Sequence, residues 1–204
     1  MKRGATFLVL IAAGFMACGA ADEYRPRSGD IVFQTSRSAQ SVAVQKATKS
    51  AYSHMGIVYV RGGEPYVYEA VGPVKLTPLS EWIERGLRGH FVARRLREAE
   101  EILTVAALER MLAVGRTFDG KPYDLYFEWS DDRIYCSELV WKIYKRALNL
   151  EVGKLQVIAE FDLSDPIVQS KFQERFGGPP PPQEVVVSPA AIFSSPLLVT
   201  VFER

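Results

Sequence analysis

The hairpin sequence HMGIVYVRGGEPYVYEA, residues 54–70, sets the architecture of this chain. Met55 to Val60 is rich in β-branched residues and predicts a strand, and Tyr66 to Ala70 predicts a second strand. The glycine-containing segment Arg61 to Pro65 lies between them and predicts a turn. We therefore expect the two strands to pair in antiparallel fashion.

Shorter elements flank this hairpin on both sides. Strands are predicted at 29–34, after a turn, and at 91–96. The spacing of apolar residues and the capping residues predict five helices: 38–49, 78–85, 98–114 with Gly115 as its end, 137–148, and a last one from Asp165-Pro166 to Gly177. Antiparallel strands with helices segregated beside them indicate an α+β fold.

The composition of the chain indicates one globular domain without a nucleic-acid partner. It has 204 residues, of which 25 are basic and 24 acidic, and a net charge of +1. That balance gives no reason to expect nucleic acid or another anionic partner. The run Gly177 to Pro182 is expected to be a stiff connector, and the apolar residues after it to pack back on the same domain. We expect residues 22–204 to form this single domain.

The first 21 residues have the pattern of a secretory signal peptide. Lys2 and Arg3 precede an uncharged apolar run from Phe7 to Ala17, and small residues follow. Such a run is too short and wrongly flanked for a membrane span. Cleavage after Ala20 or Ala21 would leave a periplasmic or extracellular protein, so export is the expectation.

A second interpretation of the same region changes the location of the protein. Phe15-Met16-Ala17-Cys18 resembles a bacterial lipobox, although Phe15 and Met16 fit that motif poorly. Under this interpretation Cys18 becomes a lipidated N-terminus, and the protein is an envelope lipoprotein. In either case Cys18 is lost as a disulfide partner, and Cys136 is left alone in the mature chain.

Cys136 lies where the helix predicted at 137–148 begins, in the run YCSELVW, residues 135–141. The partial positive charge of a helix N-terminus stabilises a thiolate, and its free backbone N–H groups can bind an oxyanion. The alternative is a buried structural cysteine, since free cysteine is among the most buried residue types.

A cysteine nucleophile needs a base, and the chain has two histidines, His54 and His90. His54 begins a strand, at a place where a side chain can face a cleft. His90 lies in a polar, glycine-flanked turn and is expected on the surface. Counting outward from the hairpin turn brings Glu69 near His54 on the same face, where a carboxylate would orient the imidazole. The alternative for Glu69 is a surface position on an edge strand.

Together these residues carry a resemblance to a known family. The order His54, Glu69, Cys136, with GKPYD at 120–124 before the cysteine run, resembles the circularly permuted NlpC/P60 papain-like hydrolases, and within them the bacterial YiiX/YaeF group. Further segments share it, from SGDIVF at 28–33 through SHMG at 53–56 and YEAVGPV at 68–74 to Ser188-Pro189. The resemblance implies an antiparallel sheet or small barrel packed against helices.

The resemblance also implies site roles and a reaction. Cys136 would be the nucleophile, His54 the general base and Glu69 the orienting residue, with no cofactor and no metal. Tyr123 matches the family's Pro-Tyr segment and, with Ser137, is a candidate for contact with substrate or oxyanion; Tyr123 can equally be a core aromatic. The reaction would be hydrolysis of a peptide or acyl amide of the cell envelope through a thioester.

Two other functions remain open at this point. One is a non-catalytic module that binds envelope peptides on the same scaffold, against which the intact set of cysteine, histidine and glutamate argues. The other is an acyltransferase that handles lipid acyl groups, which the sequence does not separate from a hydrolase. The aromatic residues of the loop before the cysteine can line a pocket for a chain or fill the core: Tyr123, Tyr126, Phe127 and Trp129.

Overall fold

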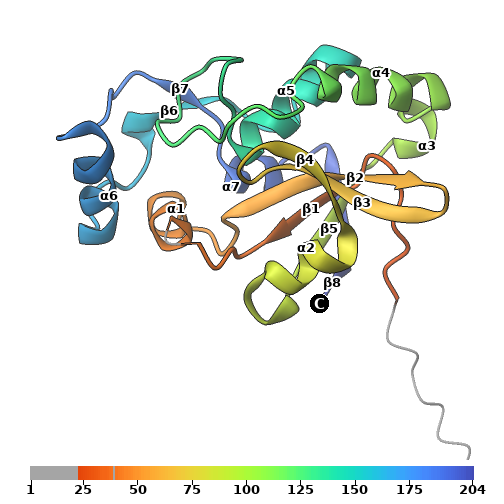
Figure 1. The fold of residues 1–204 in the computed structure, drawn as a ribbon, viewed down its shortest axis with the longest axis horizontal. Helices are drawn as coiled ribbons and strands as arrows, with labels where there is room; N and C mark the ends of the chain where they lie inside the picture. Colours follow the sequence, from red (N-terminus) through yellow and green to blue (C-terminus); the bar gives the residue numbers. More distant parts are fainter. Residues whose placement is uncertain (1–22, 39) are drawn as a thin grey trace, which may run out of the picture.

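The computed structural model describes residues 23–38 and 40–204, so the signal peptide and lipobox predicted for residues 1–21 lie outside the described residues. Its centre is one antiparallel sheet of six strands in the order β4-β3-β2-β1-β5-β8 (Figure 1). The strands are β1 (Ile31–Gln34), β2 (His54–Arg61), β3 (Glu64–Ala70), β4 (Val74–Pro78), β5 (Val92–Leu96) and β8 (Leu198–Glu203). The predicted hairpin is β2 and β3, at the middle of this sheet.

Helices cover both faces of the sheet. In Figure 1, α4 and α5 lie over one face and α2 over the other, while α1 packs against α6 beside the sheet. The helices are α1 (Ser41–Thr48), α2 (Leu79–Arg85), α3 (Ala99–Ile102), α4 (Val105–Arg116), α5 (Cys136–Leu148), α6 (Pro166–Phe176) and α7 (Pro189–Phe193). Two 3-10 turns, η1 (Leu87–Gly89) and η2 (Ile158–Glu160), and a small pair of strands, β6 (Gln156–Val157) and β7 (Val185–Val186), complete the structure.

The alternation of side chains along the central strands explains the two helical layers. Successive residues of a strand point to opposite faces. Ile31 and Phe33 therefore contribute to the larger core under α5, while Val32 joins Val58 and Trp82 in the smaller core under α2. All five side chains are fully buried, because a sheet covered on both faces has apolar residues at consecutive positions.

The expected α+β fold with an antiparallel sheet against helices is confirmed, but the alternative of a small barrel is wrong. Within the described residues, β4 and β8 stand at opposite ends of the strand order, so the sheet stays open. β8 comes from the apolar segment after the proline run and pairs with β5, for instance Leu198 with Leu96. That segment does pack back on the sheet, and it also forms α7, so the helix that starts at Pro166 is not the last one.

The helix predicted at 98–114 is two helices, α3 and α4, with a break at Leu103 and Thr104. Thr104 caps α4, because its Oγ1 accepts a hydrogen bond from the Ala107 N–H at 3.2 Å. Gly115 does not end the helix but lies inside it. A Cβ at Gly115 would lie 3.0 Å from Cε1 of Tyr68, so the glycine allows a close approach of helix and sheet.

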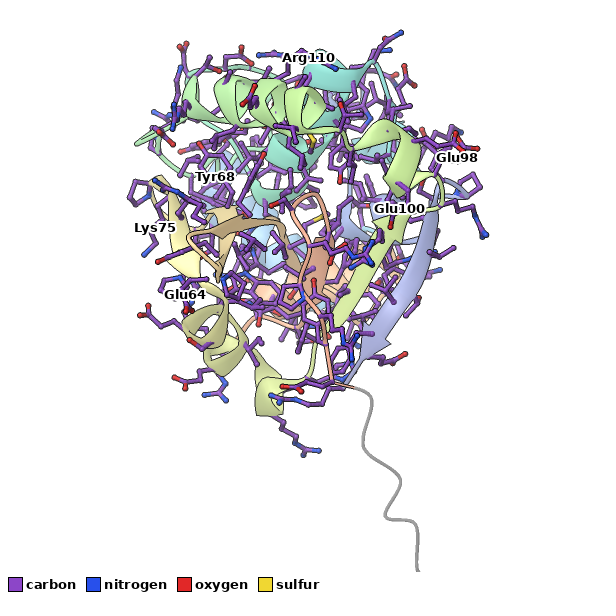
Figure 2. The ribbon with its side chains drawn as sticks, turned by 90° about the vertical axis from the view of Figure 1, so that its right-hand side faces the viewer. Glu64, Tyr68, Lys75, Glu98, Glu100 and Arg110 are labelled. Carbon is purple, nitrogen blue, oxygen red and sulfur yellow. The ribbon has the colours of Figure 1, made fainter. Side chains whose placement is uncertain are left out.

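Tyr68 fixes this approach between β3 and α4. Figure 2 shows it between the sheet and the helical layer, and its hydroxyl donates to the Gly115 carbonyl oxygen at 2.6 Å. Phe118, just after α4, is buried in the same core. None of the helices in the described part of the chain has the length and apolar character needed to cross a membrane.

Candidate active site

Cys136 is the first residue of α5, which confirms the predicted helix start at this position. Tyr135 before it has extended backbone, and its N–H donates to Oε2 of Glu138 in the first turn at 3.4 Å. Cys136 is buried, with a relative exposure of 3%. Among the described residues it is the one free cysteine, and it lines a cavity.

His54 and Glu69 form the cross-strand pair that the hairpin predicts. The printed register pairs Ile57 with Tyr68, so Glu69 lies beside Gly56, and both His54 and Glu69 project from the α2 face of the sheet. Nε2 of His54 lies 2.6 Å from Oε2 of Glu69, and both side chains are buried. Gly56 makes room for the pair, because a Cβ there would lie 3.3 Å from Cβ of Glu69 and closer still to Val67.

Glu69 has two further partners that the sequence did not reveal. Its second oxygen, Oε1, accepts hydrogen bonds from Thr77 Oγ1 at 2.6 Å and from the guanidinium of Arg85. Burial raises the pKa of Glu69, but the hydrogen bonds and positive charges of His54 and Arg85 outweigh burial and lower it. The carboxylate is therefore held ionised and fixed in direction toward His54. Thr77 belongs to β4 and Arg85 to α2. The strand β4 was not predicted from the sequence, so Thr77 could not be expected at this place.

His54 contacts Cys136 as well as Glu69. Its Nε2 faces Glu69, and the Cys136 side chain is close enough to the imidazole to raise the pKa of His54. Burial lowers the pKa of His54, but the hydrogen bonds to Cys136 and Glu69 and the charges of both raise it to about 9. The imidazolium is thus the favoured form of His54 at neutral pH.

Tyr123 lies at the same place, next to the thiol. It lines the cavity that contains Cys136 and is close enough to that side chain for the two groups to interact. Burial, followed by the charge of Cys136, raises the pKa of Tyr123 well above its usual value, so the hydroxyl keeps its proton and remains a donor. The segment after it is held by Asp124, whose Oδ1 accepts from the Tyr126 N–H at 2.8 Å.

Ser137 lines the cavity too, but its hydroxyl is engaged elsewhere. Oγ of Ser137 donates to the Val187 carbonyl oxygen at 2.8 Å, and the Val187 N–H donates to the Tyr135 hydroxyl at 3.1 Å. These two bonds fasten the start of α5 to the segment after β7. Of the two hydrogen-bond donors of Ser137, the hydroxyl is therefore occupied. The backbone N–H, in the first turn of α5, remains suited to contact with an oxyanion.

Gln40, before α1, is a site residue that sequence reasoning missed. It lines the cavity of Cys136 and the hollow that contains His54. Its Oε1 accepts from Arg175 of α6 at 2.8 Å, which orients the amide. The buried Nε2 has no hydrogen-bond partner among the described residues, so it is available to a substrate. No spacing in the sequence signals this residue, because α1 and α6 meet only in the folded chain.

The four aromatic residues of the loop before Cys136 are partly buried, and Tyr123, Phe127 and Trp129 pack against the larger core. Trp129 packs edge-on against Trp141 with ring centroids 5.4 Å apart, and Tyr126 packs against Phe176 at 5.5 Å. Of the four, only Tyr123 and Phe127 line the cavity at Cys136. His90 follows η1 and lines neither hollow of the site, so the site contains the histidine that the sequence favoured.

A buried ion pair lies in the first two turns of α5, next to the site. Lys142 Nζ lies 2.7 Å from Oε1 of Glu138 and 2.8 Å from Oδ1 of Asp131. Burial raises the pKa of Glu138 to about 7, against the opposing effect of Lys142. Removing one partner of such a buried pair strands a charge, which is strongly destabilising.

A metal-binding site needs several ligating side chains arranged around one point. In residues 23–38 and 40–204, no group of three His, Cys, Asp or Glu side chains converges to hold an ion. Nε2 of His54 is engaged by Glu69 at 2.6 Å, and the Cys136 side chain interacts with the same imidazole. The arrangement suits proton transfer between a thiol and an oriented imidazole.

Fold and site together define a papain-like cysteine hydrolase whose histidine precedes its cysteine in the chain. The chain belongs to the family of permuted papain-like amidases, the YaeF/YiiX or C92 family, which matches residues 25–202. The resemblance inferred from the sequence is thereby confirmed.

Two relatives of this chain come from Escherichia coli. The uncharacterized protein YiiX of strain K12 is 49% identical over 181 residues, which are 89% of this chain and 88% of that protein. A crystal structure of yiiX from Escherichia coli O157:H7, described there as a metalloprotein, superposes with a TM-score of 0.85 at 50% identity. That similarity covers 89% of this chain and 99% of the other.

Proposed function

We propose that this protein is an exported cysteine amidase in which Cys136 is the nucleophile, His54 the general base and acid, and Glu69 the residue that orients His54. One observation carries the proposal: the buried imidazole of His54 contacts the Cys136 side chain and lies 2.6 Å from the Glu69 carboxylate. Membership in a family of papain-like amidases supports the same chemistry.

The proposed reaction proceeds through a thioester. The Cys136 sulfur attacks the carbonyl carbon, the carbon–nitrogen bond of the amide breaks, and the His54 imidazolium gives its proton to the leaving amine. Water then attacks the thioester carbonyl while His54 takes a proton from it. The carbon–sulfur bond then breaks and the acid product leaves, which restores the Cys136 thiolate and the His54 imidazolium.

The negative charge on the attacked oxygen needs hydrogen-bond donors. Backbone N–H groups in the first turn of α5, including that of Ser137, have no acceptor within the helix. The Tyr123 hydroxyl and the unpartnered Nε2 of Gln40 add side-chain donors that line the same cavity. Fixed donors of this kind stabilise an oxyanion because they require no reorganisation during the reaction.

The description of the Escherichia coli O157:H7 relative as a metalloprotein raises the question of a metal in this chain. The described residues do not fit a site with three protein ligands of the usual types. The proposed reaction accordingly has no step through a metal, and side chains alone supply its nucleophile, base and oxyanion donors.

Location and substrate class complete the proposal. The basic residues, apolar run and small residues of the first 21 positions support export, with lipidation at Cys18 as the alternative. An exported amidase meets the peptides and acyl amides of the cell envelope, which we propose as its substrates. If Cys18 carries a lipid, the enzyme acts from the membrane surface.

Loss of the thiol tests the proposal. Cys136→Ala should lower kcat/KM for p-nitrophenyl acetate and for p-nitroacetanilide by at least about 10³-fold, because no acyl-enzyme can form. All assays contain EDTA. Circular dichroism and the unfolding midpoint show whether the variant is folded. Turnover of these substrates by folded Cys136→Ala would contradict the proposal.

The two histidines provide a matched pair for the same assay. His54→Ala should approach the Cys136→Ala rate, since the thiol then has no proton partner, whereas His90→Ala should keep the wild-type rate. A comparable loss in both variants would show that the effect is not specific to His54.

A further inference from the structure

A chain of buried hydroxyl groups ends at Ser53, the residue before His54. Nε2 of Gln45 donates to Oγ of Ser41 at 2.9 Å, and the Oγ atoms of Ser41 and Ser53 lie 2.6 Å apart. The backbone N–H of Ser36 donates to the same Oγ of Ser53 at 2.9 Å. Both serine side chains are buried, and the reaction of Cys136 proposed above leaves their hydroxyls without a role.

The directions of these hydrogen bonds follow from the number of hydrogens. A hydroxyl has one hydrogen to donate and two lone pairs that accept. If Ser53 donated to Ser41, the hydrogen of Ser41 would have no acceptor among the described residues, and Ser41 is the more buried of the two, with 2% exposure against 8%. A buried donor without an acceptor is costly. Ser41 therefore donates to Ser53, and the hydrogen of Ser53 is left free.

The Ser53 hydroxyl can consequently act only as a donor. Its oxygen accepts from the Ser36 N–H and from the Ser41 hydroxyl, so both of its lone pairs are occupied. An amine or amide N–H needs an acceptor and finds none on this oxygen. A carbonyl oxygen needs a donor, and the free hydrogen of Ser53 supplies one.

Ser53 lies at the boundary between two hollows of the site. It lines both the cavity of Cys136 and the hollow that contains His54. Its backbone is fixed as well, because its N–H donates to the carbonyl oxygen of Gln34 in β1 at 3.1 Å. A scissile amide must reach the thiol with its carbonyl carbon and the imidazole with its nitrogen. The carbonyl group of such a substrate therefore lies at the boundary that Ser53 lines.

We propose that Ser53 is a further catalytic residue, whose hydroxyl donates a hydrogen bond to the oxygen of the scissile carbonyl. This inference rests on the proposed function and adds a donor to its oxyanion site. When the Cys136 sulfur bonds to the carbonyl carbon, an electron pair of the C=O bond moves onto oxygen, and the Ser53 hydroxyl stabilises that charge. No proton leaves Ser53, because the pair returns to re-form C=O as the carbon–nitrogen bond breaks. Ser41 and Gln45 are positioning residues that direct the hydroxyl.

Comparison of an oxygen substrate with its sulfur analogue tests the inference. The probes are p-nitroacetanilide and p-nitrothioacetanilide, which share one leaving group and differ in the atom that would accept from Ser53. Sulfur is a weak hydrogen-bond acceptor. Ser53→Ala should lower kcat/KM for the oxygen substrate by about 10²-fold, as expected for loss of one oxyanion donor, and should affect the sulfur substrate much less. The ratio of the two kcat/KM values should fall by at least about tenfold.

Three further measurements separate contact with substrate from a structural role. Iodoacetamide alkylates the Cys136 thiol by displacement of iodide, without addition to a carbonyl, so Ser53→Ala should keep the wild-type rate. A slower rate would mean that the substitution displaces His54, and would overturn the inference. Ser195→Ala is the matched control, because Ser195 is buried but lines neither hollow, and it should keep the wild-type ratio. Ser41→Ala should lower the ratio by less than Ser53→Ala, since the Ser53 hydroxyl then loses the partner that directs it.

The outcomes separate this inference from the proposed function. An unchanged ratio in folded Ser53→Ala, or an equal loss for the two substrates, would overturn the role of Ser53 and leave the amidase proposal standing. If Ser53→Ala does not fold, the ratio in Ser41→Ala decides in the same way. Failure of the proposed function looks different, since Cys136→Ala would then hydrolyse both substrates at the wild-type rate.

Discussion

Glu69 has the most partners of any residue in the site. Its two oxygens contact His54, Thr77 and Arg85, and its side chain has no exposed surface. A buried carboxylate is costly unless all its hydrogen-bonding capacity is used and its charge is balanced. Thr77 and Arg85 meet that requirement, which leaves Oε2 directed at the imidazole.

Replacing this carboxylate should change the pH dependence of the enzyme. The hydrogen bonds and charges of Cys136 and Glu69 raise the pKa of His54 to about 9, so His54 can protonate a leaving amine until the pH rises through that value. Glu69→Gln removes a close negative charge, and the alkaline limb of kcat/KM should move to lower pH by about one unit or more. The dependence of kcat/KM on pH, measured with p-nitroacetanilide, shows this shift.

Glu64→Gln is the control for that experiment. Glu64 begins the same strand, and Figure 2 shows it at the edge of the molecule with its side chain exposed. It should leave the alkaline limb in place. An unshifted limb in Glu69→Gln would mean that Glu69 does not set the protonation of His54.

Sequence patterns could predict Cys136, His54 and Glu69 because each depends on local order: a helix start, a strand start and a hairpin register. Thr77, Arg85 and Gln40 could not be found in this way. Thr77 and Arg85 reach Glu69 only because β4 pairs with β3 and α2 crosses the sheet, and Gln40 depends on the meeting of α1 with α6. These contacts are set by tertiary packing, which leaves no periodic signal.

At the scale of elements, the division of the predicted helix 98–114 into α3 and α4 is the main departure. Apolar spacing continues across the break at Leu103, so periodicity alone does not show it. The break between the two helices lies at Thr104. Its backbone is extended and its side-chain oxygen caps the start of α4. A threonine within an apolar stripe is an ambiguous signal, because it is tolerated inside helices as well as at caps.

The cap makes a prediction about stability. Thr104→Ala should lower the free energy of unfolding by about 1 kcal/mol, since the Ala107 N–H loses its partner. Chemical denaturation measures this. Thr117→Ala, at the other end of α4, is the control, because the Thr117 hydroxyl bonds only a carbonyl of its own turn. Equal losses in the two variants would contradict the assignment of Thr104 as the cap.

Strand pairing between distant segments was the other limit of prediction at this scale. The β2–β3 hairpin is local and was predicted with its turn. β8 joins β5 across about a hundred residues of chain, as in the pairing of Leu198 with Leu96, and short apolar runs at the C-terminus do not specify a partner. The order of the strands in the sheet therefore could not be predicted from the sequence.

At the scale of the whole molecule, the fold brings together the proposed base, His54, and the proposed nucleophile, Cys136, from opposite halves of the sequence. The sheet carries His54 near one end of β2, and α5 packs across β2 with Cys136 at its start. The α+β architecture could be predicted from the order of the predicted strands and helices. The predicted alternative of a small barrel was wrong, because the sheet is open.

Export also belongs to this scale and has a simple test. The mass of the N-terminal peptide, measured on protein from the envelope fraction of the native host, should correspond to cleavage after Ala20 or Ala21. A diacylated or triacylated Cys18 would select the lipoprotein alternative. A chain that still begins with Met1 in that fraction would contradict the proposed processing.

A thioester on Cys136 is the intermediate of the proposed reaction, and the mass of the acid-quenched enzyme shows whether it forms. Protein mixed with p-nitrophenyl hexanoate and quenched within milliseconds to seconds should gain the mass of one hexanoyl group. Peptide mapping should place it on Cys136, and hydroxylamine at neutral pH should remove it. An active enzyme that shows no adduct at any quench time, or carries the acyl group on another residue, would contradict the account.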